Sequence, residues 1–185
     1  MIRFFFCAVI LFSASQVYAE PGVWLLVDTQ AQTLEVKNGP YTLALFKDIA
    51  IGRRGAGFKQ HRGDEVTPLG FYRIAWINEK SHYRRFYGFD YPSVDDARKA
   101  LRHGLISSYE FQRIIDAHKH NEVPPQNTAL GGMLSIHGLG RADERIHKMT
   151  NWTKGCVALT NDQINLLALW IEKGTKVVIL KFPRN

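Results

Sequence analysis

The first third of the chain alternates apolar and polar residues in the manner of β-strands. Residues 23–27 are apolar and rich in β-formers, residues 33–37 alternate, and the polar stretch 28–32 lies between them. This pattern predicts a β-hairpin. An Asn-Gly-Pro turn at 38–40 then precedes a longer predicted strand over residues 41–51.

Residues 52–67 contain four glycines and several charges, which predicts a loop. The strand pattern then resumes in four further segments. These are residues 71–77, 133–136, 155–159 and 176–182.

The middle of the chain changes to helical patterning. Ser93 with Asp96, and Ser107 with Glu110, have the three-residue spacing of capping boxes and predict two helix starts. Residues 93–130 therefore form a helical excursion from a sheet, too small to hold a core of its own. A further helix is expected from Thr160 to about Lys173, directly after the segment that contains Cys156. The fold class predicted is mainly β with α insertions.

The N-terminus has the pattern of an export signal. Arg3 precedes a continuous apolar run over residues 4–12, which is too short to span a bilayer, and residues 17–19 form a small-x-small cleavage site. We expect residues 1–19 to be a signal peptide and residues 20–185 to be a single domain in the periplasm or cell envelope. An uncleaved signal anchor is the open alternative; after cleavage no membrane anchor is expected.

Charge changes this picture only slightly. The chain has 24 Lys and Arg against 17 Asp and Glu, and removal of Arg3 with the signal leaves 23 minus 17, a net charge of +6. A basic exported protein favours anionic partners such as cell-wall polymer. The basic residues are scattered and no nucleic-acid-binding module accompanies them, so nucleic acid is not an expected partner.

Cys156 is the only cysteine that remains after signal cleavage, since Cys7 lies within the apolar run. A lone thiol in an oxidising compartment has no disulfide partner within the chain, which favours a chemical role. A thiol attacks carbonyls as the thiolate, and a nearby imidazole must take its proton. His137, nineteen residues upstream at the end of a predicted strand, is the candidate base. The alternative is that both residues belong to the core.

The other histidines gave a weaker signal. His103, His118 and His120 are close in sequence and could suggest a metal site. They lack a cysteine or supporting carboxylates nearby, so we predict no metal and no cofactor.

Two segments together resemble the catalytic domain of L,D-transpeptidases (the YkuD type). They are Ile136-His137-Gly138 and Thr153-Lys154-Gly155-Cys156, with fifteen residues between His137 and Thr153. Thr67-Pro68-Leu69-Gly70-Phe71-Tyr72 looks like the strand entry of that family, and the resemblance extends over nearly the whole chain after residue 19. It implies a β-sandwich of the L,D-transpeptidase type, with the helical excursion and a helix after the catalytic cysteine.

The resemblance also implies roles for individual residues. Cys156 would be the nucleophile, His137 its base, and the carbonyl of Gly138 would orient the imidazole. The N–H groups of Gly155 and Cys156 would form the oxyanion hole. Four residues near this pair in sequence are candidates for substrate contacts, with Thr153 also holding the turn: Arg141, His147, Trp152 and Thr153.

Three departures from the family pattern stand out. Lys154 replaces a common histidine, Ala158 stands where many members have a polar or arginine residue, and residues 106–130 look longer than the minimal domain. We expect the longer segment to be a lid over the active-site groove that limits which acyl acceptor enters.

The activity implied is acyl transfer on peptidoglycan stem peptides through a thioester, by a protein that acts as a monomer. With water as acceptor the same site would be an L,D-carboxypeptidase. Two other readings stay open: a papain-like endopeptidase, which the order of His before Cys disfavours, and a non-catalytic basic module that binds the cell wall.

Overall fold

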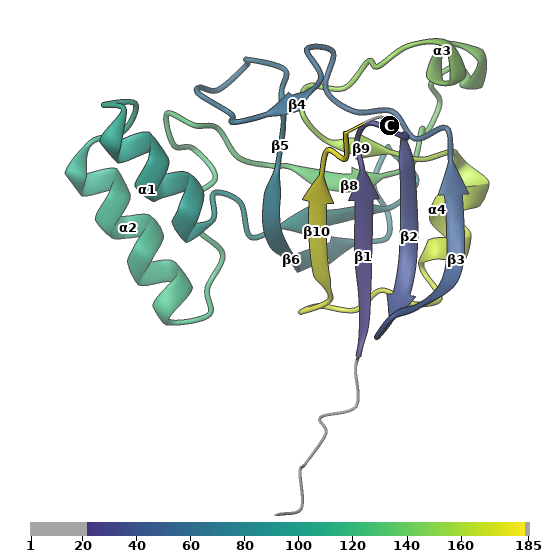
Figure 1. The fold of residues 1–185 in the computed structure, drawn as a ribbon, viewed down its shortest axis with the longest axis horizontal. Helices are drawn as coiled ribbons and strands as arrows, with labels where there is room; N and C mark the ends of the chain where they lie inside the picture. Colours follow the sequence, from purple (N-terminus) through teal and green to yellow (C-terminus); the bar gives the residue numbers. More distant parts are fainter. Residues whose placement is uncertain (1–21, 184–185) are drawn as a thin grey trace, which may run out of the picture.

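The computed structural model describes residues 22–183, and an eight-stranded sheet dominates them (Figure 1). The strand order is β3-β2-β1-β10-β6-β7-β8-β9. Their bounds are β1 Val23–Asp28, β2 Thr33–Asn38, β3 Tyr41–Lys47, β6 Gly70–Asn78, β7 Phe86–Phe89, β8 Ser135–His137, β9 Val157–Ala158 and β10 Lys176–Leu180. A separate two-stranded parallel pair joins β4 (Ala56–Gly57) to β5 (Thr67–Pro68).

Strand β6 belongs to both layers of this sheet. Its first part, residues 70–73, pairs with β10, whereas residues 74–78 pair with β7, and the register shifts between Ile74 and Trp76. The sheet folds over at this irregularity, so that β7, β8 and β9 pass behind the layer of β1, β2, β3 and β10 (Figure 1). Ala50 and Ala158 form an isolated bridge that ties the segment after β3 to β9. The mainly β fold with α insertions is confirmed.

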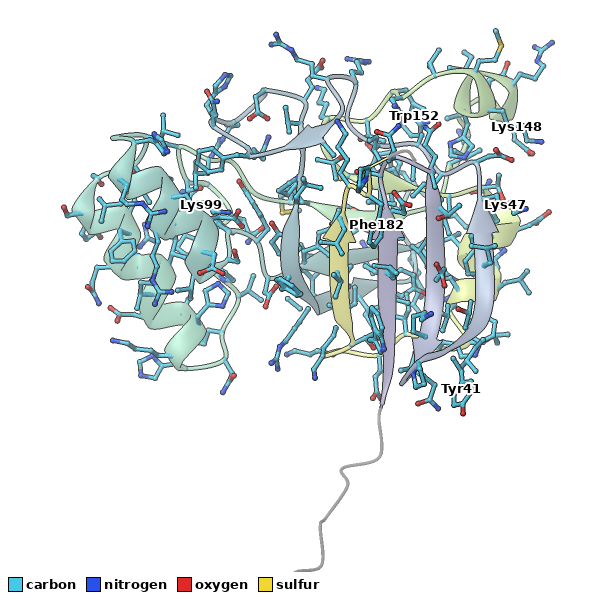
Figure 2. The ribbon with its side chains drawn as sticks, in the orientation of Figure 1. Tyr41, Lys47, Lys99, Lys148, Trp152 and Phe182 are labelled. Atoms are coloured by element: carbon cyan, nitrogen blue, oxygen red, sulfur yellow. The ribbon has the colours of Figure 1, made fainter. Side chains whose placement is uncertain are left out.

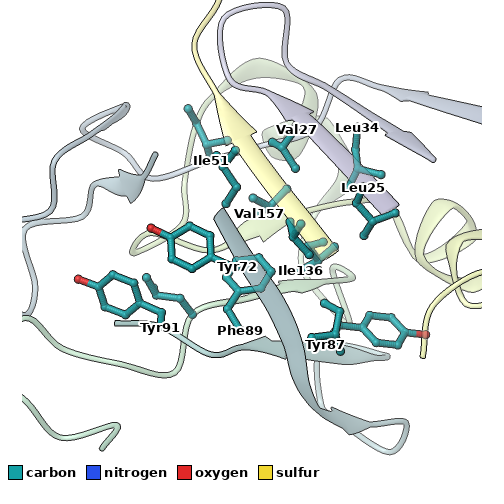
Figure 3. Packing of buried hydrophobic residues seen from close by; sticks show 14 of the residues in the cluster. Leu25, Val27, Leu34, Ile51, Tyr72, Tyr87, Phe89, Tyr91, Ile136 and Val157 are labelled. Atoms are coloured by element: carbon teal, nitrogen blue, oxygen red, sulfur yellow. The ribbon is translucent and has the colours of Figure 1, made fainter. Parts of the chain in front are cut away.

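The core lies between these two layers (Figure 3). Alternate residues of β1 and β2, such as Leu25, Val27 and Leu34, are fully buried, as the period of two predicts. The second layer contributes Phe89, Ile136 and other apolar side chains to the same cluster. Burial of Ile136 fixes the orientation of β8, and the residues on either side of it therefore face away from the core.

Within residues 22–183, four helices accompany the sheet: α1 Val94–Arg102, α2 Ser108–Lys119, α3 Glu144–Met149 and α4 Asn161–Leu167. The predicted capping boxes at Ser93 and Ser107 are confirmed, and a third stands at Thr160 with Gln163. Helices α1 and α2 pack side by side to one side of the sheet, whereas α4 lies behind β3 (Figure 1).

Two predicted elements are shorter than expected. The strand expected to reach residue 51 ends at Lys47, because Asp48 has a φ of 57° and interrupts the extended backbone. The helix expected to reach Lys173 ends at Leu167, where hydrogen bonds from Leu169 N to Leu166 O and from Trp170 N to Leu167 O tighten it into a turn.

The expected loop over residues 52–67 contains two short strands, β4 and β5. The sequence did not predict strand β7 or helix α3. The expected signal peptide, residues 1–19, lies outside the described residues. Within residues 22–183, no helix is long and apolar enough to cross a bilayer.

Candidate active site

The candidate nucleophile and base come from two adjacent parallel strands. His137 is the last residue of β8, Cys156 directly precedes β9, and Ile136 pairs with Val157. Ile136 and Val157 face the core and are fully buried. Since side chains alternate along a strand, His137 and Cys156 project on the opposite face, where both line one cavity.

The thiol of Cys156 is half-buried and lies among polar groups. The Ser135 hydroxyl donates a hydrogen bond to Sγ at 3.5 Å, and Sγ lies 3.7 Å from the carbonyl oxygen of Met133. Burial raises the pKa of the Cys156 thiol, and the hydrogen bond from Ser135 opposes this shift. The resting side chain at neutral pH is therefore the thiol, and it needs a base to react.

His137 is held in one orientation. Its Nδ1 lies 2.7 Å from the carbonyl oxygen of Gly138, and only 3% of the residue is exposed. A carbonyl only accepts, so Nδ1 carries the proton and Nε2 keeps its lone pair. Burial lowers the pKa of His137 to about 4, against the opposing effect of the Gly138 carbonyl, so the imidazole is neutral at pH 7.

Aromatic rings surround this imidazole. Tyr83 is tilted against it at 4.4 Å between ring centroids, and Phe86 is nearly parallel to it at 6.3 Å. Trp152 meets it edge-on at 5.9 Å. These rings exclude water from the base, which is the cause of its low pKa.

The loop after His137 is fixed by Asn161, the first residue of α4. Its Oδ1 accepts from the N–H groups of Leu139 and Gly140, and its Nδ2 donates to the carbonyl of Gly140 at 2.8 Å. A side chain at Gly138 would come within 2.7 Å of the carbonyl oxygen of Tyr83. Glycine is therefore required at 138, where the chain presents its carbonyl to His137.

The turn before Cys156 is organised by the Thr153 hydroxyl. Thr153 Oγ1 donates to the carbonyl oxygen of Cys156 at 2.7 Å and accepts from the N–H of Gly155 at 3.1 Å. Gly155 has a φ of 123°, and a Cβ there would come within 2.8 Å of the carbonyl oxygen of Val66. Its N–H, one of the two expected oxyanion donors, is thus engaged inside the turn by the Thr153 hydroxyl. The N–H of Cys156, the other expected donor, is not engaged by Thr153.

The expected substrate contacts divide into two groups. Trp152 and Thr153 line the cavity, whereas Arg141 is exposed and His147 is buried behind Trp152, and neither lines it. His147 Nδ1 accepts a hydrogen bond from Trp152 Nε1 at 3.2 Å. Trp152 lies below the segment that carries α3, near the ends of the strands (Figure 2). In this structure His147 supports Trp152 from behind, and the predicted substrate contacts of Arg141 and His147 stay predictions.

The cavity has a volume of about 830 Å³ and is open to solvent. Its lining combines aromatic side chains with positive charge, and Cys156 and His137 lie in it. From the expected lid, residues 106–130, only Gln126 reaches the lining; the return segment after it contributes Gly131, Gly132 and Met133. The wall of the groove is therefore the return to β8, and helix α2 stands away from it.

The three histidines considered for metal binding make separate contacts. His118 Nε2 lies 2.8 Å from the Pro92 carbonyl oxygen, His120 Nδ1 lies 2.8 Å from the Asp116 carbonyl oxygen, and His103 packs against Phe58. Among residues 22–183, no cluster of potential metal ligands is found.

The roles of two residues in this geometry were not predicted from the sequence. Ser135 could have been found from its position two residues before His137, which places both on one face of β8. Asn161 is the first residue of a helix, where a structural cap is the ordinary explanation, and no local signal shows that it bridges to the loop at 139–140.

Comparison with known proteins identifies the family and agrees with the fold. The family model of the L,D-transpeptidase catalytic domain (YkuD) matches residues 22–179. Among solved structures, the helical cell shape determining protein Pgp2 of Campylobacter jejuni has a TM-score of 0.57 and 20% identity. Bd1075 of Bdellovibrio bacteriovorus has 0.56 and 21%, and an Enterococcus faecium L,D-transpeptidase, as its C442S mutant, has 0.51 and 12%.

The alignments to Pgp2 and Bd1075 cover 90% of this chain, and the alignment to the Enterococcus enzyme covers 86%. In each case they cover 50% of the other protein, so this chain spans about half the length of the structures it resembles. No curated protein sequence matches the chain.

Proposed function

Because the chain belongs to the L,D-transpeptidase catalytic domain family, we propose that it catalyses acyl transfer on peptidoglycan stem peptides through a thioester on Cys156. The observation that carries the proposal is the state of His137. Its Nδ1 is fixed on the Gly138 carbonyl, which leaves the Nε2 lone pair as the base in the cavity that Cys156 lines.

In the first step, the sulfur of Cys156 attacks the carbonyl carbon of the third residue of a tetrapeptide stem. The thiol proton passes to Nε2 of His137 as the carbon–sulfur bond forms. The carbon–nitrogen bond to the terminal D-residue then breaks, His137 returns the proton to the leaving amine, and a thioester remains. Because both groups are neutral at rest, we expect the proton to move during the attack and not before it.

The negative charge that develops on the carbonyl oxygen needs a donor. The N–H of Cys156 is our candidate, since the Gly155 N–H is engaged by Thr153. The second role of Gly155 is steric, because a side chain there would collide with the Val66 carbonyl and displace the turn that carries the nucleophile.

The thioester is resolved by an acceptor. With an amine of a second stem peptide, the product is a crosslink and the protein is an L,D-transpeptidase. With water, the product is a shortened tripeptide and the protein is an L,D-carboxypeptidase. We place the activity outside the cytoplasmic membrane, in the periplasm or cell envelope, carried out by a monomer. Since Pgp2 is named for its part in cell shape, we also propose that this cell-wall chemistry contributes to cell shape.

The test is to incubate the protein from residue 20 with a disaccharide tetrapeptide and to resolve products by mass. A crosslinked dimer or a tripeptide is expected, together with a protein adduct on Cys156. The Cys156→Ala variant should keep its fold and lose both products and adduct, because removal of the nucleophile removes nearly all of the rate. Turnover by this variant would refute the assignment of the nucleophile.

If the protein is instead a non-catalytic module that binds the cell wall, a different result is expected. In that case Cys156 would react slowly with iodoacetamide, and its reaction would not depend on His137. The unmodified protein and the Cys156→Ala variant would then both bind peptidoglycan without changing it.

A further inference from the structure

We propose that Arg62 is the residue of this cavity that recognises a carboxylate of the stem peptide. The inference rests on the proposed function and adds to it a specificity-determining residue and the chemical group that it binds. It follows from the charges around the cavity and from how the Arg62 guanidinium is held.

The charged side chains that line the cavity containing Cys156 are all basic. Four cations line it, and among the described residues that line it none is acidic. The cations are Arg53, Lys59, Arg62 and Lys154. A concave surface with this charge concentrates anionic ligands. A stem peptide that ends in a D-residue presents a terminal carboxylate and can present others along its length.

Two of these cations are already neutralised. Arg53 pairs with Glu65 at 2.8 Å, and Lys59 forms a buried ion pair with Asp64. Asp64 also accepts hydrogen bonds from the backbone N–H groups of Gln60 and His61. The Lys59–Asp64 pair therefore stabilises the turn at 60–64 and leaves little capacity to bind a further anion.

Arg62 lies within this turn and is held from the opposite side by the return segment. Its backbone N–H donates to the carbonyl of Ala129 at 2.7 Å, and its Nη2 donates to the carbonyl of Thr128 at 3.2 Å. Thr128 is itself fixed, because its hydroxyl donates to the carbonyl of Gly131 at 2.7 Å. The guanidinium is thus oriented by one neutral carbonyl, that of Thr128, and keeps its full charge.

A guanidinium has five N–H donors, and the contact with Thr128 uses one of them. The remaining donors can form the paired hydrogen bonds that a planar carboxylate accepts, and the orientation is set before the ligand arrives. Lys154 is the other cation without an acidic partner. Both side chains are exposed, but the Arg62 guanidinium is oriented by its hydrogen bond to Thr128, whereas Lys154 is an ammonium on a flexible side chain that must lose more freedom to hold a carboxylate.

The experiment compares acid and amide forms of one peptide. The donors are a tetrapeptide stem, the same stem amidated at its terminal carboxylate, and the stem amidated at each of its other carboxylates in turn. Binding is measured on the Cys156→Ala background, so that no donor is consumed. Turnover is measured with Cys156 intact. The variants are Arg62→Gln, Arg62→Lys and Lys154→Gln. Arg54→Gln is the control, since Arg54 is an exposed neighbour that does not line the cavity.

We expect one amidated donor to bind about 10- to 100-fold more weakly than the free acid, as for the loss of a charge-assisted hydrogen-bonded pair. Arg62→Gln should remove this difference, Arg62→Lys should restore part of it, and Arg54→Gln should leave it unchanged. The amidated position that shows the difference identifies the carboxylate.

Two results would overturn the proposal. Equal binding of all donors would show that no carboxylate is recognised, and loss of selectivity in Lys154→Gln but not in Arg62→Gln would assign it to Lys154. Failure of the proposed function is seen separately: the acid would be preferred in binding, and yet no donor would be turned over with Cys156 intact.

Discussion

The indole N–H of Trp152 donates a hydrogen bond to Nδ1 of His147 at 3.2 Å. Because this nitrogen accepts, neutral His147 carries its proton on Nε2, which is buried without a hydrogen-bond partner among the described residues. Burial lowers the pKa of His147, and the backbone of Asp48 opposes this shift. Trp152 in turn meets the ring of His137 edge-on. His147 is therefore a positioning residue one layer behind the candidate base.

Replacing His147 by leucine should reduce kcat/KM by about 3- to 10-fold, the scale of one lost hydrogen bond. His147→Gln, which keeps an acceptor, should recover part of the rate. Steady-state kinetics with a tetrapeptide donor would measure both. If His147→Leu costs as much as His137→Ala, then the base has been assigned to the wrong histidine.

His137→Ala should lower the rate by about a hundred- to ten-thousand-fold, as expected for the loss of a general base. It should also slow the alkylation of Cys156 by iodoacetamide near neutral pH, since the raised pKa of the thiol leaves little thiolate without help. The measurement is the alkylation rate between pH 6 and 10, with His82→Ala as a control, because His82 also lines the cavity. Equal alkylation profiles for the His137→Ala variant and the unmodified protein would contradict the role of His137.

Local signals in the sequence predicted the helix starts well. The capping boxes at Ser93 and Ser107 depend on residues three apart, so they do not require knowledge of the rest of the fold. Strand β7 was missed because Gly88 is a poor strand former. Glycine is required at position 88 by a tertiary contact: a Cβ there would come within 2.0 Å of the ring of Trp76, which packs across that strand.

In the candidate site, too, the features carried by local sequence motifs were predicted, and those that depend on distant contacts were not. The pairing of His137 with Cys156 came from sequence motifs, and parallel strands β8 and β9 place both in one cavity. The roles of Asn161, Ser135 and the return segment at 126–133 depend on contacts between distant parts of the chain. The periodicity of the sequence does not reveal such contacts. For the same reason the expected lid was drawn over residues 106–130, of which only Gln126 lines the cavity, and it stopped before Gly131, Gly132 and Met133, which also line it.

The low pKa of His137 makes the stability of the protein depend on pH. The unfolded chain binds a proton on this histidine below about pH 6.5, whereas the folded protein does so only below about pH 4. Between these values the unfolded state holds more protons, so the contribution of His137 is fully present above pH 6.5 and is lost as the pH falls toward 4. The shift corresponds to about 3 kcal/mol.

Denaturant unfolding at pH 7 and pH 4.5 would measure this effect. The free energy of unfolding should fall less in His137→Gln than in the unmodified protein, and the difference between the two proteins isolates His137 from other titrating groups. An equal fall in both would mean that His137 is not buried as a neutral ring.

Thr153 offers the sharpest test of how the turn supports the thiol. Its hydroxyl donates to the carbonyl of Cys156 and accepts from the N–H of Gly155. Thr153→Val has nearly the same shape but leaves both backbone groups without their partner, and each unpaired buried group costs about 1–3 kcal/mol. We expect a loss of stability on this scale, together with a drop in the rate of thioester formation of at least about tenfold, because the N–H of Cys156 would no longer be fixed.

Thr153→Ser is the matched control, since it keeps the hydroxyl and loses only a methyl group. It should retain most of the stability and most of the rate. Unfolding in denaturant and a single-turnover assay with a tetrapeptide donor would separate the two effects. Should Thr153→Val lose stability and yet form the thioester at the normal rate, the turn would be needed for folding alone, and the oxyanion donor would have to be sought elsewhere than at Cys156.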